Sequence, residues 1–231
     1  MRTIGLLGGM SWESSLHYYR LVNERVRARL GGLHSAKTLL FSVDFASIEV
    51  MQREGRWGDA GVLLGDAAEH LQQGGADFLV LCTNTMHKVA STIEARVRIP
   101  LLHIADPTGD AIAKQKLRRV GLLGTRFTME ESFYRERLVT RHGLEVLTPP
   151  SAERARVHSV IYDELCLGVV RDESREEFRQ IVGSLVRAGA EGIILGCTEI
   201  MMLLAPDDVG APTFDTTTLH AYAAVDRALE P

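Results

Sequence analysis

The apolar stretch at residues 4–8, IGLLG, returns later in the chain as VGLLG at residues 120–124. A second stretch, GADFLVL at residues 75–81, returns as GAEGIIL at residues 189–195. The two copies are therefore offset by 116 and 114 residues. Chance likeness between two strands does not readily produce nearly equal offsets twice, so the repeats indicate an internal duplication.

Short apolar runs alternate with longer amphipathic stretches, which is typical of a parallel sheet covered by helices. We expect strands at residues 3–7, 38–43 and 77–81, and helices at residues 12–30, 48–54 and 58–73. The predicted fold is α/β, with two pseudo-symmetric domains that each hold a parallel sheet flanked by helices. The expected domains are residues 1–100 plus 208–231, and residues 101–207, with the active site in the cleft between them.

A third, weaker similarity relates IADPT at residues 104–108 to TFDTT at residues 213–217. Each is predicted to be a strand that ends in an aspartate, Asp106 or Asp215. Aspartate is a favoured residue at the position that caps a helix N-terminus. We therefore expect both carboxylates to cap the helix that follows, and the last helix, residues 216–229, to return to the first domain.

Composition limits the classes of partner. The 231 residues carry a net charge of −4 with no basic stripe, which argues against a general nucleic-acid binder. No apolar run approaches the roughly 20 residues that a membrane-spanning helix needs, and glycines interrupt the only apolar stretch near the N-terminus. Three cysteines, an odd number with no zinc-site spacing, indicate reduced thiols in a cytoplasmic protein without a metal.

Ligands of open parallel sheets bind beyond the carboxyl ends of the strands. Four clusters follow predicted strands, at residues 8–11, 81–87, 124–128 and 196–199. The first could bind an anion at a helix N-terminus, although it does not match the G-x-G-x-x-G pattern of dinucleotide sites.

The repeat places Cys197 opposite Thr83, whereas Cys82 falls opposite Gly196. Cys82 is therefore predicted to be a packed small hydrophobe, as is Cys166 in an amphipathic helix. Cys197 lies between a strand and an expected helix N-terminus, where backbone N–H groups lower a thiol pKa from its usual value of about 8.5. We predict a reactive thiolate at Cys197, with an inert buried thiol as the alternative.

Two other groups of polar side chains have a purely structural interpretation as well as a functional one. His87 follows Thr83 by one helical turn, so it could support that residue through a hydrogen bond or simply be buried. Gln52 and Arg53 follow the second strand and could meet a carboxylate, or the arginine could be a solvated surface residue.

The two motifs TNTMH at residues 83–87 and GCTE at residues 196–199 resemble the paired signatures of the aspartate/glutamate racemase superfamily. The usual forms are C-N-T-x-H and G-C-T-E or G-C-T-H, and the opening residues 4–12 are similar to the family as well. The resemblance covers essentially the whole chain. It implies a cofactor-independent racemase, monomeric or homodimeric, that acts on a small acidic amino acid.

The resemblance also implies the roles of individual residues. Inversion needs an acid/base group on each face of the α-carbon, and Thr83 and Cys197 match those two positions. The positions that match substrate-binding residues are Met10, Gln52, Arg53, Asn84, Thr85, Thr198 and Glu199.

The sequence departs from the majority pattern at Thr83, where most relatives have cysteine. This departure resembles a minority branch with a threonine/cysteine pair that favours L-aspartate and L-glutamate. An alcohol is a much weaker acid and base than a thiol, so slow turnover with unequal rates in the two directions is expected. Glu164 stands where some relatives have lysine, which bears on recognition of the substrate side chain.

Two other functions remain open at this point. Relatives with one effective cysteine include decarboxylases of substituted malonates and a maleate isomerase, which act from one face of the substrate. A binding protein that has lost catalysis is the third alternative. Retention of Asn84, Thr85, Cys197, Thr198 and Glu199 together argues against such a loss.

Overall fold

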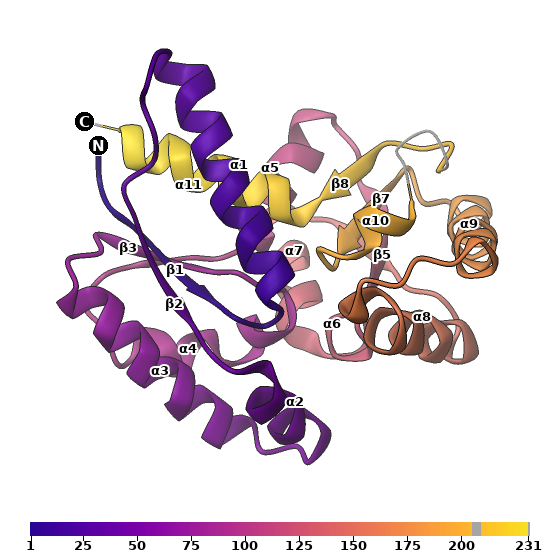
Figure 1. Ribbon diagram of the computed structural model, residues 1–231. Helices are drawn as coiled ribbons and strands as arrows, with labels where there is room; N and C mark the ends of the chain where they lie inside the picture. The colour runs from indigo at the N-terminus through magenta and orange to yellow at the C-terminus, as the bar shows by residue number, and fades with distance from the viewer. Residues whose placement is uncertain (205–208, 231) are drawn as a thin grey trace. The chain divides into compact units, whose positions relative to one another are not determined.

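The computed structural model describes residues 1–204 and 209–230, and these residues form two four-stranded parallel sheets (Figure 1). The strand orders are β2-β1-β3-β4 and β6-β5-β7-β8, the same arrangement twice. The chain divides into two compact units, Met1–Ile104 with His220–Pro231, and Ala105–Leu219. The α/β fold with two parallel sheets flanked by helices, predicted from the sequence, is confirmed.

The first unit holds strands β1 (Ile4–Gly8), β2 (Thr38–Ser42), β3 (Phe78–Leu81) and β4 (Leu101–Leu102). Its helices are α1 (Trp12–Leu30), α2 (Phe45–Arg53), α3 (Trp57–Gln73), α4 (Ala90–Glu94) and most of α11 (Thr216–Leu229), with a 3-10 turn η1 (Thr85–Val89). The second unit holds strands β5 (Arg119–Gly124), β6 (Glu145–Leu147), β7 (Gly192–Gly196) and β8 (Thr213–Asp215). Its helices are α5 (Ala105–Lys114), α6 (Arg126–Glu130), α7 (Ser132–His142), α8 (Ser151–Asp163), α9 (Asp172–Arg187) and α10 (Ile200–Leu203), with a 3-10 turn η2 (Leu165–Leu167).

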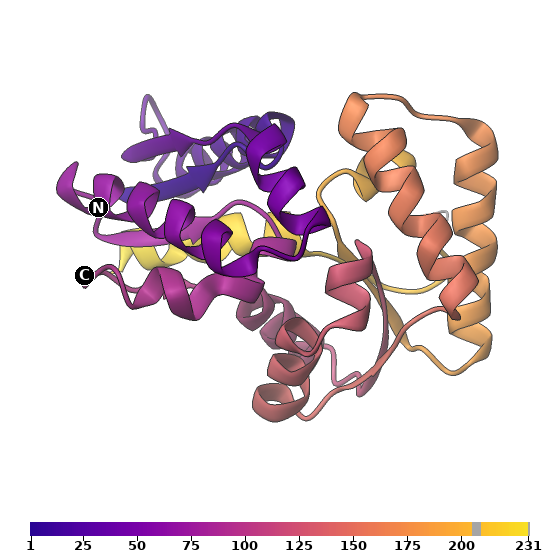
Figure 2. The same cartoon turned by 90° about the horizontal axis from the view of Figure 1, so that it is seen from below.

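The first sheet separates two apolar cores. Successive side chains of a strand point to opposite faces, so Leu79 and Leu81 pack with α3, whereas Phe78 and Val80 pack with α1 and α11. Every residue of β1 is buried, as expected for a strand covered on both faces. In the second unit, α8 and α9 lie side by side against β5 (Figure 2).

The register of the two sheets shows the duplication directly. Strand β1 pairs with β3 through Gly5 and Leu79, and β5 pairs with β7 through Gly121 and Ile193. These partners are the residues that the two sequence offsets relate. The residues that follow β3 and β7 are therefore equivalent, and the predicted correspondence of Thr83 with Cys197 agrees with the strand pairing.

The second domain boundary differs from the expectation. The expected break between residues 207 and 208 lies outside the described residues. Strand β8 pairs in parallel with β7, so Thr213–Asp215 completes the second sheet, and the chain re-enters the first unit only at His220. The first crossing is at residue 104 rather than 100.

The prediction that Asp106 and Asp215 each end a strand and cap the next helix is correct for Asp215 and wrong for Asp106. Asp215 ends β8 and accepts a hydrogen bond from the Thr217 N–H at 3.0 Å, as a capping residue should. Strand β4 ends at Leu102, and helix α5 already begins at Ala105, so Asp106 lies in the first turn of the helix. The register pairs Leu102 with Val80 and Phe214 with the equivalent Ile194, so the residue equivalent to Asp215 is the next one, His103.

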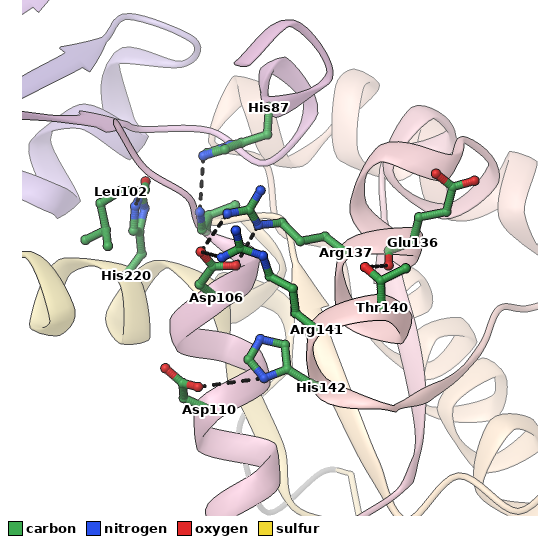
Figure 3. Close-up of polar contacts among 11 residues, drawn as sticks. His87, Leu102, Asp106, Asp110, Glu136, Arg137, Thr140, Arg141, His142 and His220 are labelled. Atoms are coloured by element: carbon green, nitrogen blue, oxygen red, sulfur yellow. Dashed lines mark hydrogen bonds and ion pairs between the residues drawn. The ribbon is translucent and has the colours of Figure 1, made fainter. Parts of the chain in front are cut away.

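Asp106 forms an ion pair with helix α7. Arg137 donates Nε–H to Oδ1 at 2.6 Å and Nη2–H to Oδ2 at 2.7 Å, and Arg141 donates to Oδ2 at 3.0 Å (Figure 3). Partial burial acts to raise the pKa of the Asp106 carboxyl, but Arg137 and Arg141 outweigh it and the pKa is lowered. Hence this carboxylate is charged at neutral pH and ties α5 to α7.

Replacing Arg137 by alanine is expected to lower the free energy of unfolding at pH 7 by about 1–2 kcal/mol, because a bidentate pair with a partly buried carboxylate is lost. A lowered carboxyl pKa stabilises the fold above the unfolded value of about 3.9, and this stabilisation is lost as the pH falls through the folded pKa. Urea unfolding should therefore show a smaller difference between variant and parent at pH 3. Arg135, exposed on the same helix, is the control, and equal effects of both alanines would refute the assignment.

Among the described helices, none combines the length and apolar character required to cross a membrane.

Candidate active site

Polar groups in the turn after β1 form hydrogen bonds with the first residues of helix α1. Gly9 has a φ of +95°, and its N–H donates to Ser15 Oγ at 2.7 Å. Ser11 caps α1 by accepting the Ser14 N–H at 3.3 Å. The anion site considered for residues 8–11 therefore lacks the Gly9 donor. The side chain of Met10 packs in the core with Leu7, so its backbone is what it can offer a ligand.

The turn after β3 holds the first sequence motif. Thr83 is half-buried and donates its N–H to the Leu81 carbonyl at 2.8 Å, while Asn84 and Thr85 are buried beside it. Cys82 is fully buried in the core that contains Val80, and this burial raises the pKa of its thiol well above the usual range. The prediction that Cys82 is a packed residue is confirmed.

Gln52 and Arg53 are separated by the geometry of helix α2. Gln52 is buried, and its Nε2 lies 3.0 Å from the sulfur of Met86, within the TNTMH motif. The Arg53 side chain is 64% exposed and pairs with Glu49 on the surface. Successive helical residues point about 100° apart, so only one of the two can face the motif. The structure brings Gln52 to the motif and leaves Arg53 on the exposed face.

The turn after β7 holds the second motif. Cys197 is buried, and its Sγ–H donates to Glu199 Oε2 at 2.9 Å. The Thr198 hydroxyl donates to the same oxygen. The carboxylate of Glu199 therefore faces the thiol directly, and its Oε2 accepts hydrogen bonds from both Cys197 and Thr198.

The thiolate expected at Cys197 is not what the structure indicates. Burial raises the pKa of the Cys197 thiol, and the negative charge of Glu199 raises it further. A backbone hydrogen bond at Glu199 acts to lower the pKa of Cys197, but burial and the Glu199 charge outweigh it. The helix that follows, α10, begins only at Ile200 and has four residues. Cys197 is a protonated thiol in the resting protein.

Cys166 and Glu164 lie in and beside η2. Cys166 is half-buried and lies in this 3-10 turn. The prediction that it lies in an amphipathic α-helix is wrong, because α8 ends at Asp163. The charge of Cys166, when ionised, would also raise the pKa of Cys197. Glu164 is buried and accepts a hydrogen bond from Ser174 Oγ at 2.7 Å. Arg156 and Arg171 lie 3.7 Å and 3.9 Å from its oxygens.

Residues 124–128 serve the local structure. Thr125 caps α6 by accepting the Thr128 N–H at 3.3 Å, and the two hydroxyls lie 3.2 Å apart. A Cβ on Gly124 would lie 2.9 Å from the Gly196 carbonyl oxygen, so the ends of β5 and β7 approach closely here. This cluster supports the Cys197 turn by close packing.

The sequence pattern did not single out His103 and His220, which are buried around His87 in the first unit. They come from distant parts of the chain, and neither belongs to a motif. Within the part of the chain that the structure describes, no group of three or more histidine, cysteine, aspartate or glutamate side chains is placed to hold a metal ion.

Fold and motifs together define a duplicated α/β protein with one polar motif just beyond β3 and a second just beyond the equivalent strand β7. A family model described as Asp/Glu/hydantoin racemase matches residues 7–224, and the chain belongs to this family. A crystal structure of a Yersinia pestis protein assigned to the Asp/Glu racemases is 53% identical, with a TM-score of 0.93 and full coverage of both chains. An aspartate racemase homologue from Pyrococcus horikoshii is 32% identical, with a TM-score of 0.85 and full coverage of both chains.

A curated relative, the broad specificity amino-acid racemase RacX of Bacillus subtilis, is 24% identical over 167 residues, which cover 71% of this chain and 70% of the relative. Family membership and relatives named racemases support an amino-acid racemase activity for this chain.

Proposed function

We propose that the protein racemises aspartate and glutamate without a cofactor, by removing the α-proton from one face and returning a proton to the other. The main observation behind the proposal is that Thr83 and Cys197 occupy equivalent positions just beyond β3 and β7, as the strand pairing of the two sheets indicates. A two-base reaction needs acid/base groups on opposite faces of one carbon, and a duplicated fold supplies such a pair from equivalent positions.

The contact between Cys197 and Glu199 supports a proton-transfer role for the thiol. To remove an α-proton, Cys197 must first lose its own proton, and Glu199 Oε2 at 2.9 Å is the acceptor in position. The resulting thiolate takes the α-proton, and the Thr83 hydroxyl protonates the carbanion on the opposite face. The proton held by Glu199 then returns through solvent to the Thr83 alkoxide. In the reverse direction the Thr83 hydroxyl first loses its proton to solvent, and the alkoxide takes the α-proton. The Cys197 thiol, already protonated, is the donor and is then reprotonated from solvent.

Thr83 limits the rate in this scheme. Its hydroxyl is a far weaker acid than a thiol, and each 1.36 kcal/mol added to a barrier slows a reaction about tenfold. We therefore propose slow turnover with unequal rates from the two enantiomers and with L-substrates favoured.

Substrate contacts in the proposal come from side chains and backbone of both motifs. Gln52, Asn84 and Thr85 are buried polar groups in or beside the first motif, and the backbone of Met10 belongs to the turn after β1. Thr198 and Glu199 flank the thiol in the second. Arg53 is the weakest of the predicted contacts, because its side chain is exposed and paired with Glu49.

The remaining features of the proposal concern the setting of the protein. All three cysteines are free thiols, which supports a reducing, cytoplasmic location. We propose a small-molecule amino acid as the ligand and a monomer or homodimer as the working form.

Proton NMR in D₂O tests this function. The purified protein is incubated separately with each enantiomer of glutamate, aspartate, alanine and lysine, with no cofactor added. We expect loss of the α-proton signal of L-glutamate or L-aspartate, with the D-enantiomer appearing on a chiral column. Racemisation of alanine or lysine at a higher rate would overturn the acidic specificity and favour a broad substrate range.

Two other outcomes would overturn the mechanism. Exchange of the α-proton without inversion would mean that Cys197 acts and Thr83 does not. No exchange with any amino acid, together with carbon dioxide release from a 2-substituted malonate or isomerisation of maleate, would establish the one-sided alternative.

A further inference from the structure

Three imidazole rings cluster in the interior of the first unit. His87 comes from η1, His103 follows β4, and His220 lies in α11, and all three are buried. The ring centroid of His87 lies 4.5 Å from that of His103 and 5.9 Å from that of His220. Buried polar groups of this kind are expected to be hydrogen-bonded, so their contacts reveal their protonation.

The contacts of His87 identify its tautomer. Its Nε2 lies 3.2 Å from the backbone nitrogen of Ile104, and an amide N–H can only donate, so Nε2 carries no proton. Its Nδ1 lies 2.7 Å from the carbonyl oxygen of Thr83, which can only accept. The ring is therefore neutral, with its proton on Nδ1, and it joins the backbone at Thr83 to the backbone at Ile104.

His220 holds the neighbouring backbone group in the same way. Its Nε2 lies 2.8 Å from the Leu102 carbonyl oxygen, so Nε2–H donates (Figure 3). Its Nδ1 accepts from the Tyr18 hydroxyl at 2.9 Å. The first unit consists of two chain segments, and Leu102 and Ile104 lie at the end of the first of these, Met1–Ile104. Two imidazoles thus anchor the short segment that carries the chain out of this unit.

We infer that His87 is a positioning residue for Thr83. The peptide group between Thr83 and Asn84 is oriented by the Nδ1–H bond to its carbonyl oxygen, and the orientation of that peptide determines where the Thr83 hydroxyl and the Asn84 amide point. The Ile104 N–H in turn keeps the ring in the tautomer that can donate. This inference rests on the proposed function only in assigning the Thr83 hydroxyl a part in proton transfer.

Two conservative substitutions separate the two contacts of the ring. In His87→Asn, the side-chain amide nitrogen stands as many bonds from Cα as Nδ1, so the donor to Thr83 is kept and the acceptor for Ile104 is lost. In His87→Gln, the amide oxygen reaches the place of Nε2, so the acceptor for Ile104 is kept and the donor to Thr83 is lost.

We expect His87→Asn to keep kcat for α-proton exchange within about threefold of the parent, and His87→Gln to lower kcat at least tenfold, because one lost hydrogen bond is typically worth that factor. KM should rise as kcat falls in His87→Gln, because the same peptide orients Asn84, a proposed substrate contact. Circular dichroism and thermal unfolding verify that both variants fold. Equal kcat in the two folded variants would overturn the positioning role.

NMR supplies a readout that needs no catalysis. Long-range ¹H–¹⁵N spectra of the imidazoles should show His87 protonated at Nδ1 and bare at Nε2. Hydrogen exchange of the Ile104 amide should be faster in His87→Asn than in His87→Gln. The opposite tautomer, or equal amide exchange in both variants, would refute the inference even in a protein that racemises nothing, whereas absent racemisation with the expected spectra would refute only the proposed function.

Discussion

Cys197→Ser is expected to reduce α-proton exchange at least a thousandfold. Serine is close in size and keeps a donor to Glu199 Oε2, so the turn after β7 should persist. Its hydroxyl is a much weaker acid than a thiol, however, and a thousandfold loss corresponds to about 4 kcal/mol in the barrier. Because Thr83 is the other proposed proton-transfer residue, the variant would have an alcohol at both proposed positions.

Cys82→Ala is the matched control, because it removes the other thiol that follows an equivalent strand. Cys82 is fully buried in the core around Val80, so the variant should retain the parental exchange rate within about threefold. Loss of the buried sulfur should lower the free energy of unfolding by roughly 1 kcal/mol. Exchange rates measured in D₂O decide between the two thiols: activity retained in Cys197→Ser and abolished in folded Cys82→Ala would reverse the assignment.

Gly9→Ala is expected to abolish stable folding of the first unit. The φ of +95° at Gly9 is strained for any residue with a Cβ. A Cβ built there would overlap the backbone oxygen and nitrogen of Val43, which follows β2 directly. Backbone atoms cannot rotate away as a side chain can, and Val43 N–H also donates to the Gly8 carbonyl at 3.0 Å. We expect a loss above about 4 kcal/mol, in the range that only severe defects reach.

Gly31→Ala provides the comparison that isolates the overlap. Gly31 also has a positive φ, +74°, but a Cβ there would meet no atom within 4 Å. This variant should therefore show only the conformational cost of a Cβ at this backbone geometry, about 1–3 kcal/mol. The stabilities of the two variants are compared by soluble yield and by urea unfolding at the same protein concentration. Similar midpoints for the two alanine variants would show that the turn at Gly9 can relax.

Much of the architecture follows from the sequence because strand patterning is local. The two offsets of 116 and 114 residues reappear in the pairing of Gly5 with Leu79 and of Gly121 with Ile193. A parallel strand alternates its side chains strictly, so this register alone separated Cys82, which packs in the core, from Thr83, which lies in the turn. The equivalence of Thr83 and Cys197 needed no structure.

Other features depend on a long-range contact or on rotation around a helix, which local sequence patterns do not give. Arg53 and Gln52 are neighbours in sequence, yet helix geometry turns one to the surface and the other toward Met86. Asp106 has the composition of a helix cap but lies within α5, because β4 is short. Its charge is instead paired with Arg137, a residue that no local pattern relates to it.

The sequence by itself determined the duplicated α/β architecture, the two motifs and the pairing of Thr83 with Cys197, because these depend on residue spacing along strands and helices. Only the tertiary structure decided the state of the side chains. The Cys197 thiol is protonated since it is buried and faces the Glu199 carboxylate, and the His87 tautomer is determined by a backbone N–H from Ile104. Burial and hydrogen-bond partners come from residues brought together by folding, so protonation is a property of the assembled structure.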